Sequence, residues 1–409
     1  MKEISRRKVI QTTGLAICGV FLFKNDIWAN KVDNMNITPF IVSIDNNSIE
    51  DLKSRIGNVR WPNTITNSEW QLGTDLAFLK DLCDYWRTAY SWRETEKLIN
   101  SYPNFIARID GIDIHFIHVK GKGKKNLPLI ITPGWPGSFL EMLKIIPLLT
   151  DDPEFSFDIV VPSLPGFGFS GKPEKFGCNS HLIAGLWQKL MVALGYTRYC
   201  VQGGDIGAGV GTWLALLYPE QVLGLHLNFI PGSYRPYISP GEKLLPEEEE
   251  FRQRVNSWSV AEGAYGAIQS TKPQTLSYAL NDSPVGLCAW LSEKFYCWSD
   301  HKRALDEVIS KDELLGNISL YWLTQTLPSS ARIYWENSRK PLTFGKDDRI
   351  KIPVAFARFP KELPTPPRTY IERGYNIRQW TEMPAGGHFA ALEQPKLLAA
   401  DVQKFFRSI

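Results

Sequence analysis

The chain has 409 residues, more than the ~100–200 residues of a typical domain, so we expect two units or one core with insertions. Its composition, 44% hydrophobic and 22% charged, excludes a disordered, collagen-like or polytopic membrane protein. The formal net charge is +3 and falls to zero without residues 1–29, which hold three more basic than acidic side chains. Such a balance excludes electrostatic binding to nucleic acid.

The first 29 residues have the pattern of an export signal. The pair Arg6 and Arg7 precedes an apolar run at 14–23, and a small residue, Ala29, ends the segment. A run of ten is far shorter than the roughly 20 residues that cross a membrane. We therefore expect residues 1–29 to be a twin-arginine-type signal peptide, and the mature protein to be periplasmic or secreted without a stable membrane span.

Cysteine usage predicts neither disulfides nor a metal. Beyond residue 29 the cysteines are odd in number and irregularly spaced: Cys83, Cys178, Cys200, Cys288 and Cys297. This spacing fits neither a disulfide framework nor a zinc site, so we expect no metal.

Short apolar segments alternate with segments of helical periodicity along much of the chain. The expected strands are 112–119, 128–132, 157–161, 199–203, 222–229, 352–359 and 377–383. The expected helices are 48–57, 75–86, 92–99, 139–149, 183–194, 208–218 and 390–406. This alternation predicts an α/β fold with a mostly parallel sheet covered by helices.

The alternation is lost in a polar, aromatic-rich stretch after residue 230 and resumes near residue 345. We interpret this stretch as a cap inserted into the core, and caps of this kind lie over the carboxyl ends of parallel strands, where ligands bind. The expected organisation after the signal is an N-terminal segment at 30–125, the first part of the core at 126–230, the cap at 231–344 and the second part of the core at 345–409.

The strongest chemical motif is Val-Gln-Gly-Gly-Asp-Ile-Gly at 201–207. It lies between an expected strand and an expected helix, with Gly203 and Gly207 two residues on either side of Asp205. This is the spacing of a nucleophile elbow, whose tight turn needs small neighbours so that one side chain stands exposed above the sheet. An Asp at this place could equally cap the following helix, and the motif alone does not separate the two interpretations.

A candidate base and acid follow in the order that such an elbow requires. His388 lies in Gly-Gly-His-Phe between the last expected strand and the terminal helix, and Glu362 is the first acidic residue after the strand 352–359. Asp205, Glu362 and His388 thus have the order nucleophile, acid and base. Other acidic residues nearby compete with Glu362, namely Asp347, Asp348 and Glu372.

From Phe40 to its C-terminus the chain resembles the microsomal-type epoxide hydrolases, including their N-terminal segment. The matching motifs are RWP at 60–62, DYWR at 84–87, DGIDIHF at 110–116, GWPGS at 134–138, PSLPGFGFS at 162–170, ALNDSPVGL at 279–287 and GGHFAA at 386–391. The resemblance implies the alpha/beta-hydrolase fold, with helices on both faces of the sheet, a helical cap and an N-terminal extension.

The resemblance also implies a function and its residues. The expected enzyme converts epoxides to vicinal diols with water, through an alkyl ester on Asp205 that Glu362 and His388 help to hydrolyse. Two cap tyrosines, Tyr265 and Tyr334, are implied to hold the epoxide oxygen. The implied chemistry uses no cofactor, and its partners are the epoxide and water.

The backbone N–H groups of Trp135 and Ile206 are expected to form the oxyanion hole, and both residues are expected to contact substrate. The sequence departs from the family at Pro133, where a histidine is usual, and at Ile206, where an aromatic residue is usual. A haloalkane dehalogenase is an alternative with the same nucleophile, although Ile206 replaces the tryptophan that binds halide there. A noncatalytic descendant that binds apolar ligands is a second alternative, which Pro133 keeps open.

Overall fold

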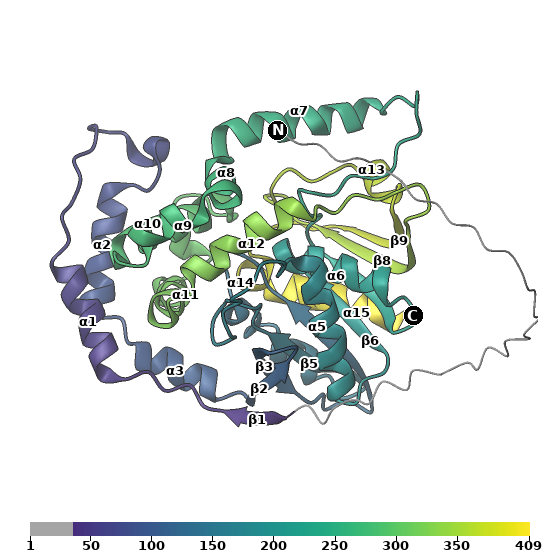
Figure 1. The fold of residues 1–409 in the computed structure, drawn as a ribbon, viewed down its shortest axis with the longest axis horizontal. Helices are drawn as coiled ribbons and strands as arrows, with labels where there is room; N and C mark the ends of the chain where they lie inside the picture. Colours follow the sequence, from purple (N-terminus) through teal and green to yellow (C-terminus); the bar gives the residue numbers. More distant parts are fainter. Residues whose placement is uncertain (1–35) are drawn as a thin grey trace, which may run out of the picture. The chain divides into compact units, whose positions relative to one another are not determined.

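The computed structural model describes residues 36–409, and the expected signal peptide lies outside the described residues. Nine strands form one sheet in the order β1-β2-β3-β5-β4-β6-β7-β8-β9 (Figure 1). The strands are β1 (Ile37–Phe40), β2 (Asn104–Ile109), β3 (Ile112–Val119), β4 (Lys125–Thr132), β5 (Phe155–Pro162), β6 (Tyr199–Gly203), β7 (Val222–Leu227), β8 (Ile350–Arg358) and β9 (Tyr375–Glu382). Within this part of the chain, no helix is both long and apolar enough to cross a membrane.

The sheet is parallel from β5 through β4 to β9, and antiparallel where β1, β2 and β3 join it. The central strands are buried on both faces, as Leu129, Ile130 and Ile131 in β4 illustrate with 0% exposure. Burial on both faces is why the parallel strands have continuous apolar sequences. The alpha/beta-hydrolase fold expected from the sequence is therefore confirmed.

Helices cover both faces of the sheet. On one face α5 (Ser180–Ala193) packs beside α6 (Asp205–Leu217), and α15 (Pro395–Arg407) lies on the other (Figure 1). The short helix α4 (Ile146–Thr150) contacts α15. Two expected helices are each broken in two. The first, 139–149, is divided into η2 (Phe139–Met142) and α4, and the second into α14 (Ala390–Glu393) and α15. Each break has a proline at its far side, Pro147 in the first turn of α4 and Pro395 in that of α15. Proline is tolerated in a first turn, but it cannot continue a preceding helix, so the helix ends before it.

The N-terminal segment supplies both strands and helices. Its helices are α1 (Asn46–Gly57), η1 (Glu69–Leu72), α2 (Leu76–Thr88) and α3 (Trp92–Asn100). The sequence did not predict the strands β1 and β2. At the antiparallel edge of the sheet β2 pairs with β3, and β1 pairs with the other side of β2. On α2, Trp86 Nε1 donates a buried hydrogen bond to Ser319 Oγ at 2.9 Å, which ties the N-terminal helices to the cap.

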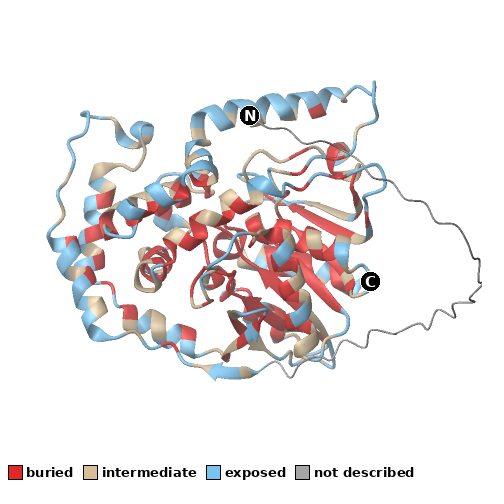
Figure 2. Cartoon of the chain, in the orientation of Figure 1, coloured by how far each residue is buried: buried red, intermediate tan, exposed pale blue. Residues whose placement is uncertain are grey.

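In the segment 231–344, where strand and helix alternation fails, the regular elements are all helices, joined by loops. Its helices are α7 (Pro246–Glu262), α8 (Ala264–Thr271), α9 (Pro273–Leu280), α10 (Pro284–Trp298), η3 (Leu305–Glu307), α11 (Lys311–Thr324) and α12 (Leu327–Arg339). Figure 2 shows that α7 is almost wholly exposed, whereas α10, α11 and α12 carry many buried side chains.

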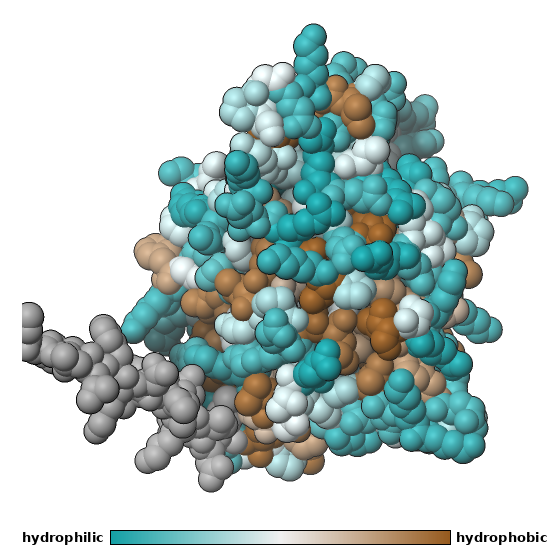
Figure 3. Space-filling view, turned by 90° about the vertical axis from the view of Figure 1, so that its right-hand side faces the viewer, coloured by the Kyte–Doolittle hydropathy of each residue, from teal (hydrophilic) through white to brown (hydrophobic). Residues whose placement is uncertain are grey.

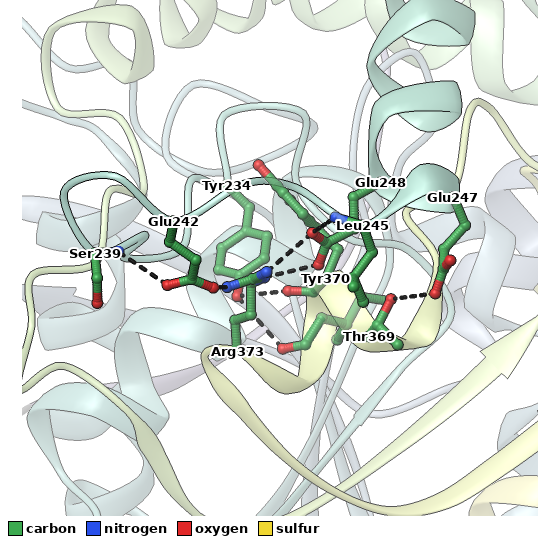
Figure 4. Close-up of polar contacts among 10 residues, drawn as sticks. Tyr234, Ser239, Glu242, Leu245, Glu247, Glu248, Thr369, Tyr370 and Arg373 are labelled. Atoms are coloured by element: carbon green, nitrogen blue, oxygen red, sulfur yellow. Dashed lines mark hydrogen bonds and ion pairs between the residues drawn. The ribbon is translucent and has the colours of Figure 1, made fainter.

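The long helix α7 is anchored by an ion-pair cluster at its first turn (Figure 4). Arg373, just after α13 (Arg368–Glu372), donates from Nε and Nη2 to the two carboxylate oxygens of Glu248 at 2.7 and 3.0 Å. Its Nη1 donates to Glu242 at 2.5 Å. Glu248 is the only buried residue of α7, so the anchor lies where the helix meets the core.

The surface itself is mixed. In Figure 3, on the side of the molecule at the right of Figure 1, hydrophilic side chains surround hydrophobic ones that gather in the middle of the face. Exposed large hydrophobic side chains occur on separate elements, as Leu182 of α5, Leu217 of α6 and Val260 of α7 show. Single exposed side chains of this kind are ordinary on protein surfaces, and we assign them no role.

Candidate active site

Asp205 stands at the sharp turn between β6 and α6. Its φ is +46°, a left-handed conformation that costs a residue with a Cβ on the order of 1–3 kcal/mol. The flanking glycines make the turn possible, since a Cβ on Gly203 would lie 2.4 Å from the carbonyl oxygen of Gly207. A Cβ on Gly207 would lie 1.9 Å from the carbonyl oxygen of Thr132. The glycine spacing in the sequence therefore reflects a strained elbow rather than a simple helix cap.

The two oxygens of the Asp205 carboxylate have different neighbours. Oδ1 accepts a hydrogen bond from the backbone N–H of Trp135 at 2.8 Å, and Oδ2 lies 3.6 Å from His388 Nε2. Ile206 is the second residue of α6, in the first turn, where N–H groups have no partner within the helix. Of the two expected oxyanion donors, the N–H of Trp135 is thus bonded to the Asp205 carboxylate, and the N–H of Ile206 stays a prediction.

His388 and Glu362 come from the loops after β9 and β8. His388 Nδ1 lies 2.6 Å from Glu362 Oε1, and the two side chains are only 3% and 1% exposed. Of the competing acids, Asp347 is exposed, Asp348 accepts from the backbone of Gly345, and Glu372 pairs with Arg368. Among the four candidates, Glu362 is the one in contact with the histidine.

Electrostatics at this pair favour the charged imidazole. Burial opposes protonation of His388, but the carboxylates of Glu362 and Asp205 outweigh it and raise the pKa of His388 well above its usual value. His388 is therefore an imidazolium while both carboxylates keep their charges. Losing the charge of Asp205 removes one of the two causes of the raised pKa.

Tyr265 of α8 and Tyr334 of α12 face each other across the cap, with ring centroids 5.8 Å apart. The pKa of Tyr265 is raised by burial and, to a smaller extent, by the charge of Asp205. The pKa of Tyr334 is raised well above its usual value by burial, by the neighbouring Tyr265 and by the charge of Asp205. Both phenols therefore stay protonated. The indole of Trp135 stacks on Tyr265 at 5.3 Å and meets Tyr334 edge-on at 5.6 Å.

A cavity of about 840 Å³ connects these groups. Asp205, Ile206, Tyr265 and Tyr334 line it together with apolar and aromatic side chains, which include Trp213, Phe229, Phe251, Val255 and Trp258. A volume of this order is typical of a pocket for a small organic ligand. Ile206 thus lies where we expected substrate contact. Trp135 is not among the cavity's lining residues, because its indole is packed against the tyrosines.

Two residues near the site have no counterpart in the sequence predictions. Trp298 of α10 packs edge-on against the His388 ring at 5.1 Å, and its carbonyl oxygen accepts from the N–H of His388. Glu141 of η2 is buried, and burial raises its pKa to about 8. Its position three residues after the GWPGS motif was the available signal, but no spacing rule marks a lone glutamate there.

One group of potential metal ligands occurs in the described part of the chain, outside the elbow. Side-chain atoms of Glu262, Glu293 and Cys297 approach within 4.8 Å of one another. The ammonium group of Lys294 lies 2.6 Å from Glu293 and 4.0 Å from Glu262. Lys294 therefore already supplies the positive charge that a metal would bring, and we assign no metal to this cluster.

Comparisons with known proteins identify the family of this chain. Residues 37–142 match the family described as epoxide hydrolase N terminus, and residues 128–258 match the alpha/beta hydrolase fold. A putative epoxide hydrolase of Stigmatella aurantiaca is 46% identical over 91% of this chain and 85% of its own length. Epoxide hydrolase 1 of Oryctolagus cuniculus is 39% identical over 91% of this chain and 89% of its own.

Solved structures give the same result. Juvenile hormone epoxide hydrolase from Bombyx mori is 30% identical with a TM-score of 0.82, covering 91% of this chain and 95% of its own. The epoxide hydrolase of Aspergillus niger is 32% identical with a TM-score of 0.81, covering 92% and 97%. The chain therefore belongs to the epoxide hydrolase family, as the sequence motifs indicated, and is a hydrolase that acts on epoxides.

Proposed function

We propose that this enzyme opens its substrate through an alkyl ester on Asp205. The observation that carries the proposal is the position of Asp205 on the wall of the large cavity, which it shares with Tyr265 and Tyr334. The carboxylate attacks one carbon of the strained ring, a C–O bond forms, and the ring C–O bond breaks. The epoxide oxygen departs as an alkoxide toward the tyrosines.

The tyrosines supply the proton that the alkoxide needs. A phenol has an ordinary pKa of about 10 and is far more acidic than an alcohol. Their raised pKa values keep Tyr265 and Tyr334 protonated until the alkoxide forms. Phenol donors also favour an epoxide over the haloalkane alternative, because a halide leaving group needs no proton.

Hydrolysis of the ester is the second half of the proposed reaction. Esterification removes the charge of Asp205, and the pKa of His388 then falls because one of its two carboxylate neighbours is neutral. His388 can then take a proton from water, while Glu362 orients the ring and stabilises the imidazolium that forms. The oxyanion that forms accepts hydrogen bonds from the N–H groups of Trp135 and Ile206. One such donor lowers the activation free energy by about 3 kcal/mol.

A single turnover in heavy-oxygen water tests the ester. Water attack on the ester carbonyl places the label in the Asp205 carboxylate, where mass spectrometry of the peptide detects it. We expect Asp205→Asn to abolish diol formation and His388→Gln to accumulate the alkyl-enzyme, with styrene oxide as the probe. Label found only in the diol would mean direct attack of water on the epoxide and would overturn the proposal.

The substrate is proposed to be a lipophilic epoxide. The aromatic and aliphatic lining of the large cavity supports this class, and its volume of about 840 Å³ accommodates more than a minimal epoxide. A panel of aliphatic and aromatic epoxides, compared by kcat/KM, tests it. Higher efficiency with small hydrophilic epoxides than with lipophilic ones would contradict this assignment.

The export signal expected at residues 1–29 remains a proposal of its own. It is supported by Arg6 and Arg7 ahead of a short apolar run. Replacing both arginines by lysine is expected to leave precursor in the cytoplasm. Normal export of the doubly substituted protein would refute the signal.

A further inference from the structure

Asp205 separates two cavities of very different size. On one side is the large cavity of about 840 Å³, and on the other is a chamber of about 20 Å³. Among the described residues, Asp205 is the one side chain that lines both. His388 lines the small chamber and not the large cavity. The proposed base therefore faces the carboxylate from the side opposite the substrate.

The chamber has the size and polarity of a site for one water molecule. A buried water needs at least ~10–15 Å³ and two to four polar partners. Gln202 Nε2 donates to Asn228 Oδ1 at 2.9 Å, which leaves Gln202 Oε1 as an acceptor. This oxygen is buried and has no hydrogen-bond partner among residues 36–409. An orphaned acceptor lining a chamber of this size points to a bound donor such as water.

Glu141 supplies a second polar group to the same chamber. Its side chain folds back against Gly137, where a Cβ would lie 1.1 Å from Glu141 Oε1. Only glycine at position 137 allows this placement. Burial and the charge of Asp205 raise the pKa of Glu141, to about 8, while His388 acts in the opposite direction. At neutral pH the carboxyl is therefore largely protonated and can both donate and accept a hydrogen bond.

We propose that the small chamber holds the water that hydrolyses the ester on Asp205, and that Glu141 and Gln202 are its positioning residues. The inference rests on the ester mechanism proposed above. The water oxygen bonds to Cγ of Asp205, one of its protons passes to His388 Nε2, and the bond between Cγ and the ester oxygen breaks. The departing alkoxide takes that proton from the His388 imidazolium and leaves as the diol. The water oxygen stays in the carboxylate, and the second water proton restores the tyrosine phenol that protonated the epoxide oxygen.

This arrangement makes the two half-reactions separable. Alkylation takes place on the side of Asp205 that faces the large cavity, and it does not need the chamber. Loss of a positioning residue is therefore expected to slow ester hydrolysis and leave alkylation unchanged. In a two-step reaction, slower hydrolysis lowers kcat and KM together, so that kcat/KM is preserved.

The test compares Glu141→Leu, Glu141→Gln and Glu336→Gln by rapid-quench kinetics with styrene oxide. Glu141→Leu removes hydrogen bonding, and we expect ester hydrolysis to slow roughly 10-fold to 100-fold while the alkylation rate holds. Glu141→Gln keeps two hydrogen-bonding atoms and is expected to restore much of the loss. Glu336 is a buried carboxylate of α12 that accepts from the N–H of Gly177, away from the chamber, so Glu336→Gln is the matched control.

A second variant, Gln202→Leu, keeps the test decisive should Glu141→Leu fail to fold. It removes the orphaned acceptor and is expected to give the same selective loss. If the wild-type enzyme forms no alkyl-enzyme, the ester mechanism itself fails. If the wild type forms the ester but the folded variants change both steps equally, or neither step, the chamber assignment is overturned and the ester mechanism stands.

Discussion

The anchor of α7 provides a quantitative test of the fold around the large cavity. Arg373→Met leaves the carboxylate of Glu248 without its cation, although that side chain is only 1% exposed. Breaking a buried ion pair typically costs 3–5 kcal/mol. Because Arg373 is itself 17% exposed, water can partly replace it, so we expect about 3 kcal/mol. This corresponds to a change of roughly 150-fold in the unfolding equilibrium.

Two further variants separate the buried pair from general effects of charge. Arg368→Met removes the i,i+4 ion pair between Arg368 and Glu372, both in α13, whose side chains are exposed. We expect this change to lower the free energy of unfolding by less than about 0.5 kcal/mol. The double variant Arg373→Met, Glu248→Met replaces the whole pair by apolar side chains, and most of the lost stability is expected to return.

The assay is urea unfolding of the purified protein, together with hydrogen exchange of the α7 amides. Exchange is expected to rise mainly in α7, because Glu248 lies in its first turn. KM is expected to rise as well, since Phe251 and Val255 of α7 line the large cavity. The reasoning is refuted if Arg373→Met costs no more than Arg368→Met, or if the double variant is as unstable as the single one.

Three other predictions follow from the site and the core. Tyr265→Phe and Tyr334→Phe are each expected to slow alkylation about tenfold or more, and the double variant about 10³-fold, in single-turnover assays; unchanged alkylation in the double variant would exclude the tyrosines as acids. Ile206→Trp is expected to shift kcat/KM toward aromatic epoxides by up to roughly tenfold, and equal scaling across a panel would contradict this. Burial lowers the pKa of His115 to about 3, whereas an unfolded histidine titrates near 6.5. The unfolded chain therefore binds a proton first, and His115 alone is expected to lower the free energy of unfolding by about 1.4 kcal/mol per pH unit from pH 6.5 toward 3. His115→Gln is expected to show a smaller slope in urea unfolding, to which His118, whose pKa burial lowers to about 4, still contributes.

The core of the fold was predictable because of how parallel sheets are buried. Strands covered on both faces must be apolar at successive positions, and segments such as 128–132 and 199–203 therefore stand out in the sequence. The cap contains none of these doubly covered strands. Most residues of α7 are exposed, with Phe251 and Val255 toward the large cavity, whereas α11 is buried along most of its middle. The contrast between an apolar and a polar face is therefore weak in both helices. Helical periodicity is correspondingly weak between residues 231 and 344.

The candidate site was predictable where local sequence determines local geometry. The glycines around Asp205 report a strained turn, and chain order placed Glu362 and His388 after neighbouring strands. The tyrosines came from the family resemblance, because nothing local distinguishes Tyr265 or Tyr334 from packing aromatics. Their function depends on α8 and α12 meeting across the cap, which is a tertiary contact.

The two departures from the family pattern lie on opposite sides of Asp205. Ile206 lines the large cavity, so its effect falls on the substrate and on the alkylation step. Pro133 lines the small chamber, and the N–H that bonds Asp205 belongs to Trp135, so the absence of an N–H at Pro133 does not remove this donor. Proline at this place therefore leaves the Trp135 donor of Asp205 intact. We expect Pro133 to act through the chamber, where we propose that the ester is hydrolysed, so its effect on turnover is expected to be the same for all substrates.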